Sequence, residues 1–449
     1  MSTNSNSNEV NNIVGDVQTV FVSNSYLEEL SATMRRRTIP WEGYQRASLI
    51  TKEEFDLIEA VENISREQLH AILNKDGDTY AQLYISLLER TMRIDTVQHV
   101  LVLIGDMLSE NEKRAVYFHN TSIKDPEFPY RPFLKLIHKD EDFIQLESAK
   151  ILAILVCTAP KLPHDFTEFF QWIVSKLKSI NPFVTDLAVQ ILGSILKVPE
   201  CRKKTWNIPQ ALDNLVHLLK DKTPTPQMQY QIIFCFWLLT FDDEIAANFN
   251  KKYDIIPTLI DIAKSAIKEK VIRVIIGTFR NMIEKAPEEN FPAMLVARLL
   301  NFLENLSGRK WSDTEILEDI EFLKTQLQEN FQSLTTFDVY GSEIRSGKLH
   351  WSPPHQSEQF WKQNATKLNE KEHELLKILA RILSTSTENL VLSVAAHDLG
   401  QYVKYYPNGK KFLQEIGAKQ RIMELMTHED PDVRYQALLA VQKYMTNAW

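Results

Sequence analysis

Residues 184–195 read Val184-Thr-Asp-Leu-Ala-Val-Gln-Ile-Leu-Gly-Ser-Ile195. Counting from Val184, apolar or small residues stand at the third, fourth, seventh and eleventh following positions. These offsets place the side chains on one stripe of an α-helix, whereas a β-strand would alternate with a period of two. The stretch therefore predicts a helix that buries one face.

The same ladder of apolar positions occurs five times between residues 97 and 282. Its anchors are Val97, Ile144, Val184, Tyr230 and Val271, separated by 47, 40, 46 and 41 residues. The ladder from Ile144 is weaker at its third position. A helical unit of about 40 to 47 residues is typical of HEAT and armadillo solenoids, where each unit buries its stripe against the next. The predicted fold class is therefore all-α, a HEAT/armadillo-like α-solenoid.

The ladder is interrupted once. After Met282 it weakens, and residues 330–354 combine Ser, Thr and Gly with a Pro-Pro pair. It returns at Leu392 and, 41 residues later, at Val433. This interruption predicts two lobes joined by a short irregular linker. The predicted parts are a disordered Asn/Ser-rich tail at 1–20, an N-terminal helical-repeat domain at 21–330, a linker at 331–340 and a C-terminal helical-repeat domain at 341–449.

The composition agrees with an all-helical chain and excludes several classes of protein. Gly accounts for only 12 of 449 residues, so tight turns that need positive φ are few. The net charge of −8, with both signs interspersed, lacks the basic stripe that nucleic acid binding requires. The longest apolar run, Ile232–Leu239, is too short to cross a bilayer, and the polar start lacks the features of a signal peptide. We therefore expect a cytoplasmic protein that binds no nucleic acid and does not insert into membranes.

A possible calcium loop is incomplete. Asn74, Asp76 and Asp78 have the spacing of the first three ligands. Thr79 replaces the glycine of such a loop, and Ile85 replaces its bidentate glutamate. An ordinary polar loop is the better interpretation.

Other chemical groups also lack partners in the sequence pattern. The cysteines are Cys157, Cys201 and Cys235, which lie far apart and are expected to be buried, reduced thiols. Cys157, with His164 as a conceivable base, lies in an apolar run where nothing lowers its pKa. His350 and His355 flank a Pro-Pro pair without a third metal ligand, and no Gly-rich phosphate loop occurs. We therefore predict a protein that is not an enzyme and has no catalytic, cofactor-binding or metal site.

Four blocks of the sequence resemble, in the same order, the H subunit of the vacuolar-type (V-type) proton ATPase. They are Ile39-Pro-Trp-Glu-Gly-Tyr-Gln-Arg-Ala47, Leu349-His-Trp-Ser-Pro-Pro-His-Gln-Ser-Glu-Gln-Phe-Trp361, Ala395-Ala-His-Asp-Leu-Gly400 and His428-Glu-Asp-Pro-Asp-Val-Arg-Tyr-Gln-Ala-Leu-Leu-Ala-Val-Gln442. The resemblance covers nearly the whole chain from about residue 20. It implies a two-domain helical-repeat protein that regulates a rotary proton pump and has no active site of its own.

The resemblance also implies partners and a location. The family's N-terminal domain contacts the E and G subunits of the peripheral stalk, and its C-terminal domain lies between the catalytic sector and the cytosolic part of the membrane-embedded a subunit. The family is needed for coupled ATP hydrolysis and proton transport, and it helps to silence hydrolysis in the released catalytic sector. The expected location is the cytosolic face of acidic organelle membranes, such as those of the vacuole, endosome, lysosome or contractile vacuole.

Nine residues are candidates for partner contacts. They are Trp41, Tyr44, Trp351, Trp361, His397, Asp398, His428, Glu429 and Asp430. For the aromatic residues a second interpretation stays open, in which they close the exposed end of a repeat array. The polar residues lie beside or between the last two ladders, where solenoids commonly present binding loops, although a plain solvated surface is the alternative.

A rival interpretation is an armadillo-type cargo or scaffold adaptor that is unrelated to the pump. Nuclear-import receptors of this type bind basic peptides through a repeated Trp-x-x-x-Asn pattern. The residues four positions after Trp41, Trp172, Trp206, Trp237, Trp311, Trp351 and Trp361 include no asparagine. The adaptor is therefore the weaker hypothesis.

Overall fold

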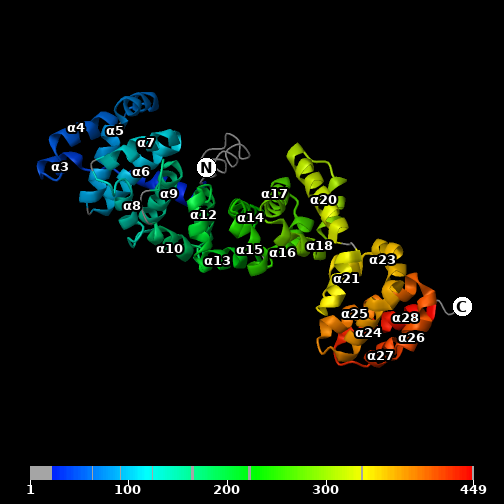
Figure 1. The fold of residues 1–449 in the computed structure, drawn as a ribbon. Helices are drawn as coiled ribbons and strands as arrows, with labels where there is room; N and C mark the ends of the chain where they lie inside the picture. The colour runs from blue at the N-terminus through cyan, green and yellow to red at the C-terminus, as the bar shows by residue number, and fades with distance from the viewer. Residues whose placement is uncertain are drawn as a thin grey trace. The chain divides into compact units, whose positions relative to one another are not determined.

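The computed structural model describes residues 23–62, 64–91, 93–123, 125–162, 166–220, 224–334 and 337–446. All regular elements within these residues are helices, and none is a strand (Figure 1). None of the described helices combines the length and the apolar character needed to span a membrane. The expected tail at 1–20 lies outside the described residues.

The chain forms two compact units. One contains residues up to 249 together with 266–281, and the other contains 250–265 and 282–449. The α-helices up to residue 285 are α2 (Ser25–Arg35), α3 (Trp41–Arg46), α4 (Lys52–Val61), α5 (Arg66–Arg90), α6 (Ile94–Glu110), α7 (Ala115–His119), α8 (Tyr130–Leu136), α9 (Asp142–Thr158), α10 (Thr167–Lys176), α11 (Pro182–Ile195), α12 (Pro199–Trp206), α13 (Pro209–Lys220), α14 (Pro226–Leu239), α15 (Asp243–Tyr253), α16 (Ile255–Ser265) and α17 (Glu269–Lys285).

The α-helices after residue 285 are α18 (Pro287–Val296), α19 (Leu299–Ser307), α20 (Thr314–Leu334), α21 (Phe337–Ser346), α22 (Pro353–Gln356), α23 (Glu358–Asn364), α24 (Glu370–Thr385), α25 (Asn389–Tyr405), α26 (Lys410–Glu415), α27 (Ala418–Leu425) and α28 (Pro431–Thr446). Four short 3₁₀ helices also occur among the described residues. They are η1 (Glu112–Arg114), η2 (Asn120–Ile123), η3 (Ala365–Asn369) and η4 (Pro407–Gly409).

The five predicted ladders fall on helices α6, α9, α11, α14 and α17. Helix α9 packs between α6 and α11, and α11 packs in turn against α14. From α17, the Asn281 side chain donates hydrogen bonds to the Trp237 carbonyl at 3.3 Å and to the Thr240 hydroxyl at 3.2 Å, both at the end of α14. Successive ladder helices are therefore neighbours in space, which confirms the predicted solenoid.

Burial of the ladder side chains holds this stack together. In α11 the side chains of Leu187, Ala188 and Ile191 are fully buried. Burying one aliphatic side chain the size of leucine or isoleucine contributes roughly 1.5–3 kcal/mol. Since no single helix can shield its own stripe from water, each unit depends on its neighbours.

Helix starts follow the local signals in the sequence. Thr51 and Glu54 form a capping box, with each side chain accepting a hydrogen bond from the other's backbone N–H. Asp430 caps α28, since its Oδ1 accepts hydrogen bonds from the backbone N–H groups of Asp432 at 2.9 Å and Val433 at 3.1 Å. Both helix starts are therefore fixed by side chains next to the first turn of the helix.

The stretch at 331–340, predicted as an irregular linker, contains helix ends. Helix α20 continues to Leu334 and α21 begins at Phe337, so the described residues of this stretch are helical rather than irregular. Tyr340 and Ile344, four positions apart on α21, are fully buried. This stripe of two residues is too short to form a ladder in the sequence. The division into compact units falls elsewhere, near 281, and the predicted domain bounds stay a prediction.

The second unit is built around α25 and α28, which carry the ladders from Leu392 and Val433. Their backbones approach closely at Gly400. A Cβ atom at this position would lie 2.9 Å from both the Cα and the Cβ atom of Ala440. The glycine therefore permits the two helix backbones to meet.

We expect Gly400→Ala to destabilise the packing of α25 on α28 by about 1–3 kcal/mol, because the Ala440 backbone cannot move aside. Amide hydrogen exchange in these two helices, followed by mass spectrometry, should become roughly tenfold faster or more. Gly43→Ala is the control, since the nearest atom to its added Cβ would be 3.9 Å away. Unchanged exchange in Gly400→Ala would show that this contact is not tight.

Candidate functional site

The described residues contain neither a cluster suited to metal binding nor a cysteine whose pKa is lowered. No set of three or more His, Cys, Asp and Glu side chains there is arranged to hold a metal ion. The three cysteines carry free thiols, and Cys157 is half-buried whereas Cys201 and Cys235 are buried. Burial raises the pKa of Cys201 to about 12, which makes a thiolate at neutral pH rare.

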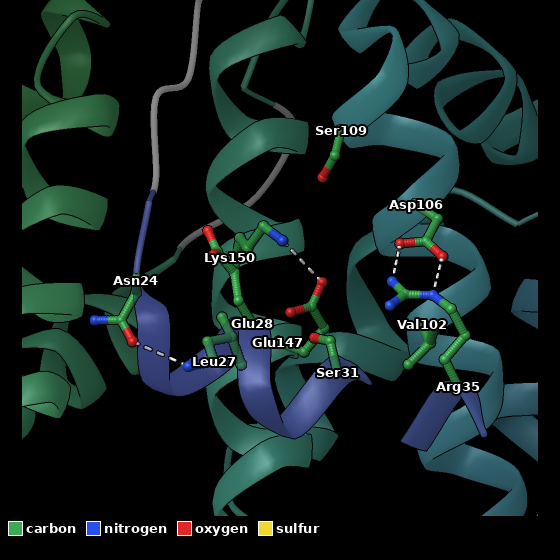
Figure 2. Close-up of a pocket in the computed structure, with 10 residues that line it drawn as sticks. All are labelled: Asn24, Leu27, Glu28, Ser31, Arg35, Val102, Asp106, Ser109, Glu147 and Lys150. Atoms are coloured by element: carbon green, nitrogen blue, oxygen red, sulfur yellow. Dashed lines mark hydrogen bonds and ion pairs between the residues drawn. The ribbon is translucent and has the colours of Figure 1, made fainter. Parts of the chain in front are cut away.

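Helix α2 crosses the ladder helices and packs against both α6 and α9. At its start, Asn24 caps the helix through Leu27 N and donates a hydrogen bond to the Phe183 carbonyl of α11 at 2.9 Å. At its end, Arg35 makes a bidentate ion pair with Asp106 of α6, with N–O distances of 2.6 and 3.0 Å (Figure 2). The helix is thus attached at both ends to residues far away in the sequence.

A second contact anchors the chain just before α2. The backbone N–H of Ser23 donates to the Gln190 side-chain oxygen, and the Gln190 amide donates to the Ser23 carbonyl, both at 2.9 Å. These residues are 167 positions apart. Leu27 and Met34, seven positions apart, form the buried face of α2. Their spacing indicates a helix in the sequence, but it does not indicate where that helix packs.

The predicted contact residues Trp41 and Tyr44 lie inside the fold. Both belong to α3 and are buried. The Trp41 ring meets the rings of Tyr44 and His99 edge-on, with centroid distances of 5.8 and 6.0 Å. The Tyr44 hydroxyl lies 3.0 Å from the Thr96 hydroxyl of α6. These contacts favour the interpretation in which the two aromatics close the first repeat.

A buried polar network surrounds Asp398 in the second unit. Its Oδ2 lies 2.7 Å from His355 Nδ1 and accepts a hydrogen bond from the Tyr340 hydroxyl at 3.0 Å. The other ring nitrogen of His355 lies 3.2 Å from Glu343 Oε1. Trp361, also fully buried, donates its indole N–H to the His355 carbonyl at 3.1 Å. Asp398 and Trp361 are therefore structural in this conformation.

The electrostatics of this network favour a charged histidine. Burial by itself would lower the pKa of His355, but the Asp398 carboxylate and, after it, Glu343 raise it to about 10. For Asp398, burial acts to raise the pKa, and the contacts with His355 and His397 outweigh it and lower the pKa. His355 and Asp398 thus form an ion pair without exposure to water.

His397 and Trp351 lie at the edge of the same network. His397 Nδ1 is 3.2 Å from Asp398 Oδ1, and the Trp351 ring meets the His397 ring edge-on at 5.1 Å. Both side chains are half-buried. The pairing of His355 with Asp398, which are 43 positions apart, was not predicted from the sequence. The sequence did contain one sign that Asp398 lies close to the buried face of its helix, because this residue stands directly before the ladder residue Leu399.

The loop from His428 to Asp430 is the most accessible of the predicted contacts. Glu429 is exposed, whereas His428 and Asp430 are half-buried. Arg434 holds the loop by donating hydrogen bonds to the carbonyls of His428 and Glu429, both at 2.7 Å. Asn389 donates a further hydrogen bond to Asp430 at 2.9 Å. The loop is therefore a firmly held surface feature that presents the Glu429 carboxylate to solvent.

We expect Asp398→Asn to lower the free energy of unfolding at pH 7 by about 3 kcal/mol, because it leaves the His355 cation buried without its main partner. The pKa of His355 is raised in the folded state, so its stabilising contribution is complete below about pH 6.5 and is lost as the pH rises toward 10. The effect of Asp398→Asn in urea unfolding should therefore shrink at about pH 9.5. The exposed-site control, Glu429→Gln, should change little at either pH. An equal loss at both pH values would contradict the ion pair.

Comparisons with known proteins agree with this architecture. Two family models, both described as the H subunit of the V-ATPase, match residues 25–327 and 333–449. The chain is 38% identical over 439 residues to the V-type proton ATPase H subunit of Drosophila melanogaster, and the match covers 96% of this chain and 92% of the relative. It is 34% identical to a probable V-type proton ATPase H subunit of Caenorhabditis elegans, with 94% and 92% covered, and 30% identical to the H subunit of Dictyostelium discoideum, with 92% and 93% covered. The chain therefore belongs to the family of V-ATPase H subunits.

Proposed function

We propose that this chain is a non-catalytic regulatory subunit of the V-type proton ATPase. One observation carries the proposal: two family models follow one another along the chain and together leave out little more than its first 24 residues. The three relatives described above as V-type proton ATPase H subunits match along more than nine-tenths of their own lengths. A regulatory role also suits a chain whose apolar helix faces pack on one another, which leaves helix surfaces for contacts with other proteins.

In the proposed mechanism the chain acts by joining other subunits. The N-terminal domain binds the E and G subunits of the peripheral stalk, and the C-terminal domain binds between the catalytic sector and the cytosolic part of the membrane-embedded a subunit. This bridge supports coupled ATP hydrolysis and proton transport in the assembled pump. When the catalytic sector is released, the C-terminal domain shifts and blocks rotation, which silences hydrolysis. Hinge motion between compact units is a common route to such switching.

The location follows from the proposed partners. As a peripheral subunit, the chain resides on the cytosolic face of the membrane that houses the pump. Since none of the described helices could span that membrane, attachment runs through the other subunits. The firmly held loop from His428 to Asp430 is the predicted contact that best suits a regulatory interface, because Glu429 is accessible there.

Affinity isolation of the tagged full chain under gentle conditions should recover the catalytic-sector and stalk subunits of the pump in constant proportion. The purified chain alone should hydrolyse no ATP, because its proposed role needs no active site. Quantitative mass spectrometry and a coupled ATPase assay provide the two measurements. Recovery of other proteins without any pump subunit would instead support the adaptor hypothesis.

Glu429→Arg should weaken silencing and raise ATP hydrolysis of the released catalytic sector by roughly two- to fivefold, as expected for a surface charge contact worth about 0.5–1 kcal/mol. The loop should keep its conformation, because Arg434 holds it through the Glu429 backbone carbonyl rather than the side chain. Glu415→Arg, another exposed acidic side chain in the same unit, is the matched control. Equal hydrolysis in both variants and unchanged sector binding would remove the loop from the proposed interface.

A further inference from the structure

A partly open cavity of about 300 Å³ lies where α2 crosses α6 and α9 (Figure 2). Its polar lining includes Ser31 from α2, Ser109 from α6, and Glu147 and Lys150 from α9. A single bridging water needs only about 10–15 Å³ of such space, so the cavity is large enough for a side chain or a small organic group. Nothing in the proposed pump mechanism uses this cavity.

Glu147 is an unusual residue for its position. It occupies the third position of the ladder from Ile144, where the other four ladders place Val100, Leu187, Ile233 and Val274. Like those aliphatic side chains it is buried, with only 2% of its surface exposed. A carboxylate at an apolar ladder position costs stability unless it is paired and hydrogen-bonded. The weakness of this ladder in the sequence is therefore a sign of a site.

The pairing of Glu147 is incomplete. Its Oε1 accepts a hydrogen bond from Lys150 Nζ at 3.2 Å. Its Oε2 is buried and has no hydrogen-bond partner among the described residues. An ionised carboxylate can accept about four hydrogen bonds, and a buried acceptor that stays unsatisfied is unfavourable. One oxygen of this cavity-lining carboxylate therefore has unused capacity to accept a hydrogen bond.

The neighbouring helix makes room for this carboxylate. A Cβ atom added at Gly105 of α6 would lie only 2.2 Å from Glu147 Oε1. Any larger residue at 105 would force the carboxylate to move. Glycine is unfavourable inside a helix relative to alanine, and here it permits the buried position of Glu147.

The charges and walls of the cavity select the type of ligand. The lining contains the acidic residues Glu28, Asp106 and Glu147 but only two basic ones, Arg35 and Lys150. Arg35 and Asp106 pair with each other, so they supply no net charge. The remaining lining is acidic overall. The side chains of Leu27 and Val102 form the apolar part of the cavity wall.

We propose that this cavity binds a guanidinium or ammonium group on a short aliphatic stem, as presented by an arginine or lysine side chain of a partner protein. Glu147 Oε2 accepts a hydrogen bond from the cation, and the Ser31 and Ser109 hydroxyls are further acceptors in the lining. The aliphatic stem lies against Leu27 and Val102. A charge-assisted hydrogen bond to a buried carboxylate is strong enough to make such a residue an anchor.

The test uses the full chain with labelled Leu and Val methyl groups, since Leu27 and Val102 report on the cavity in NMR spectra. The probes are n-butylguanidinium and n-butylammonium, with butyrate as the anionic control. Both cations should shift the Leu27 and Val102 signals saturably, and butyrate should not. Glu147→Gln should weaken cation binding at least tenfold. Glu168→Gln, an exposed acidic site on α10, should bind as the unmodified chain does.

Two further variants test the geometry in opposite directions. Gly105→Ala should weaken binding by displacing the carboxylate, whereas Lys150→Met should strengthen it severalfold by removing the competing cation. Absence of saturable shifts in the unmodified chain would overturn the proposal, whatever the variants do. Equal affinity in Glu147→Gln and the unmodified chain would also overturn it.

A last comparison distinguishes the two sources of such a cation. The capped tripeptide Gly-Arg-Gly should bind at least as tightly as n-butylguanidinium if the cavity receives a partner's side chain. Binding of the free cations alone would refute the partner and assign the cavity to a small organic cation. Because none of the other pump subunits takes part in this experiment, failure here is separate from failure of the proposed function.

Discussion

The structure depends on the burial of one apolar stripe on each ladder helix against the next ladder helix. Leu187, Ala188 and Ile191 show it in α11, which packs between α9 and α14. Burial worth roughly 1.5–3 kcal/mol for each large aliphatic side chain makes the stack cooperative, because no helix can satisfy its own stripe. The same burial fills the space between ladder helices with apolar side chains, so the places left for function are the surfaces and the crossings of helices.

Asp398 and Glu147 are buried carboxylates that depart from this apolar interior, and they differ in one respect. Asp398 is hydrogen-bonded to His355, Tyr340 and His397, so its charge is balanced within the fold. Glu147 has Lys150 on one oxygen and no partner on the other among the described residues. A satisfied network stabilises a unique packing, whereas a partly satisfied one has capacity for a ligand. This difference separates a structural polar cluster from the proposed binding cavity.

The predicted contact residues show how far residue types can indicate an interface. Trp41, Tyr44 and Trp361 are large aromatics in irregular sequence, which suits either the closing of a repeat or a binding surface, and the structure buries all three. Glu429 carries no such signal, yet it is accessible on a firmly held loop. The functional assignment accordingly rests on similarity along the whole chain, and the residue-level contacts stay a prediction.

Local patterns in the sequence determined the helical class, the repeat and several helix starts, such as the caps at Thr51 and Asp430. These features depend on residues within one or two turns, so periodicity and capping chemistry are sufficient to predict them. Only the tertiary structure decided that Asn24 meets Phe183, that His355 meets Asp398 and that Gly105 admits Glu147. Those partners are brought together by the packing of separate helices, and the apolar period that predicts each helix does not specify which polar residues meet across the contact.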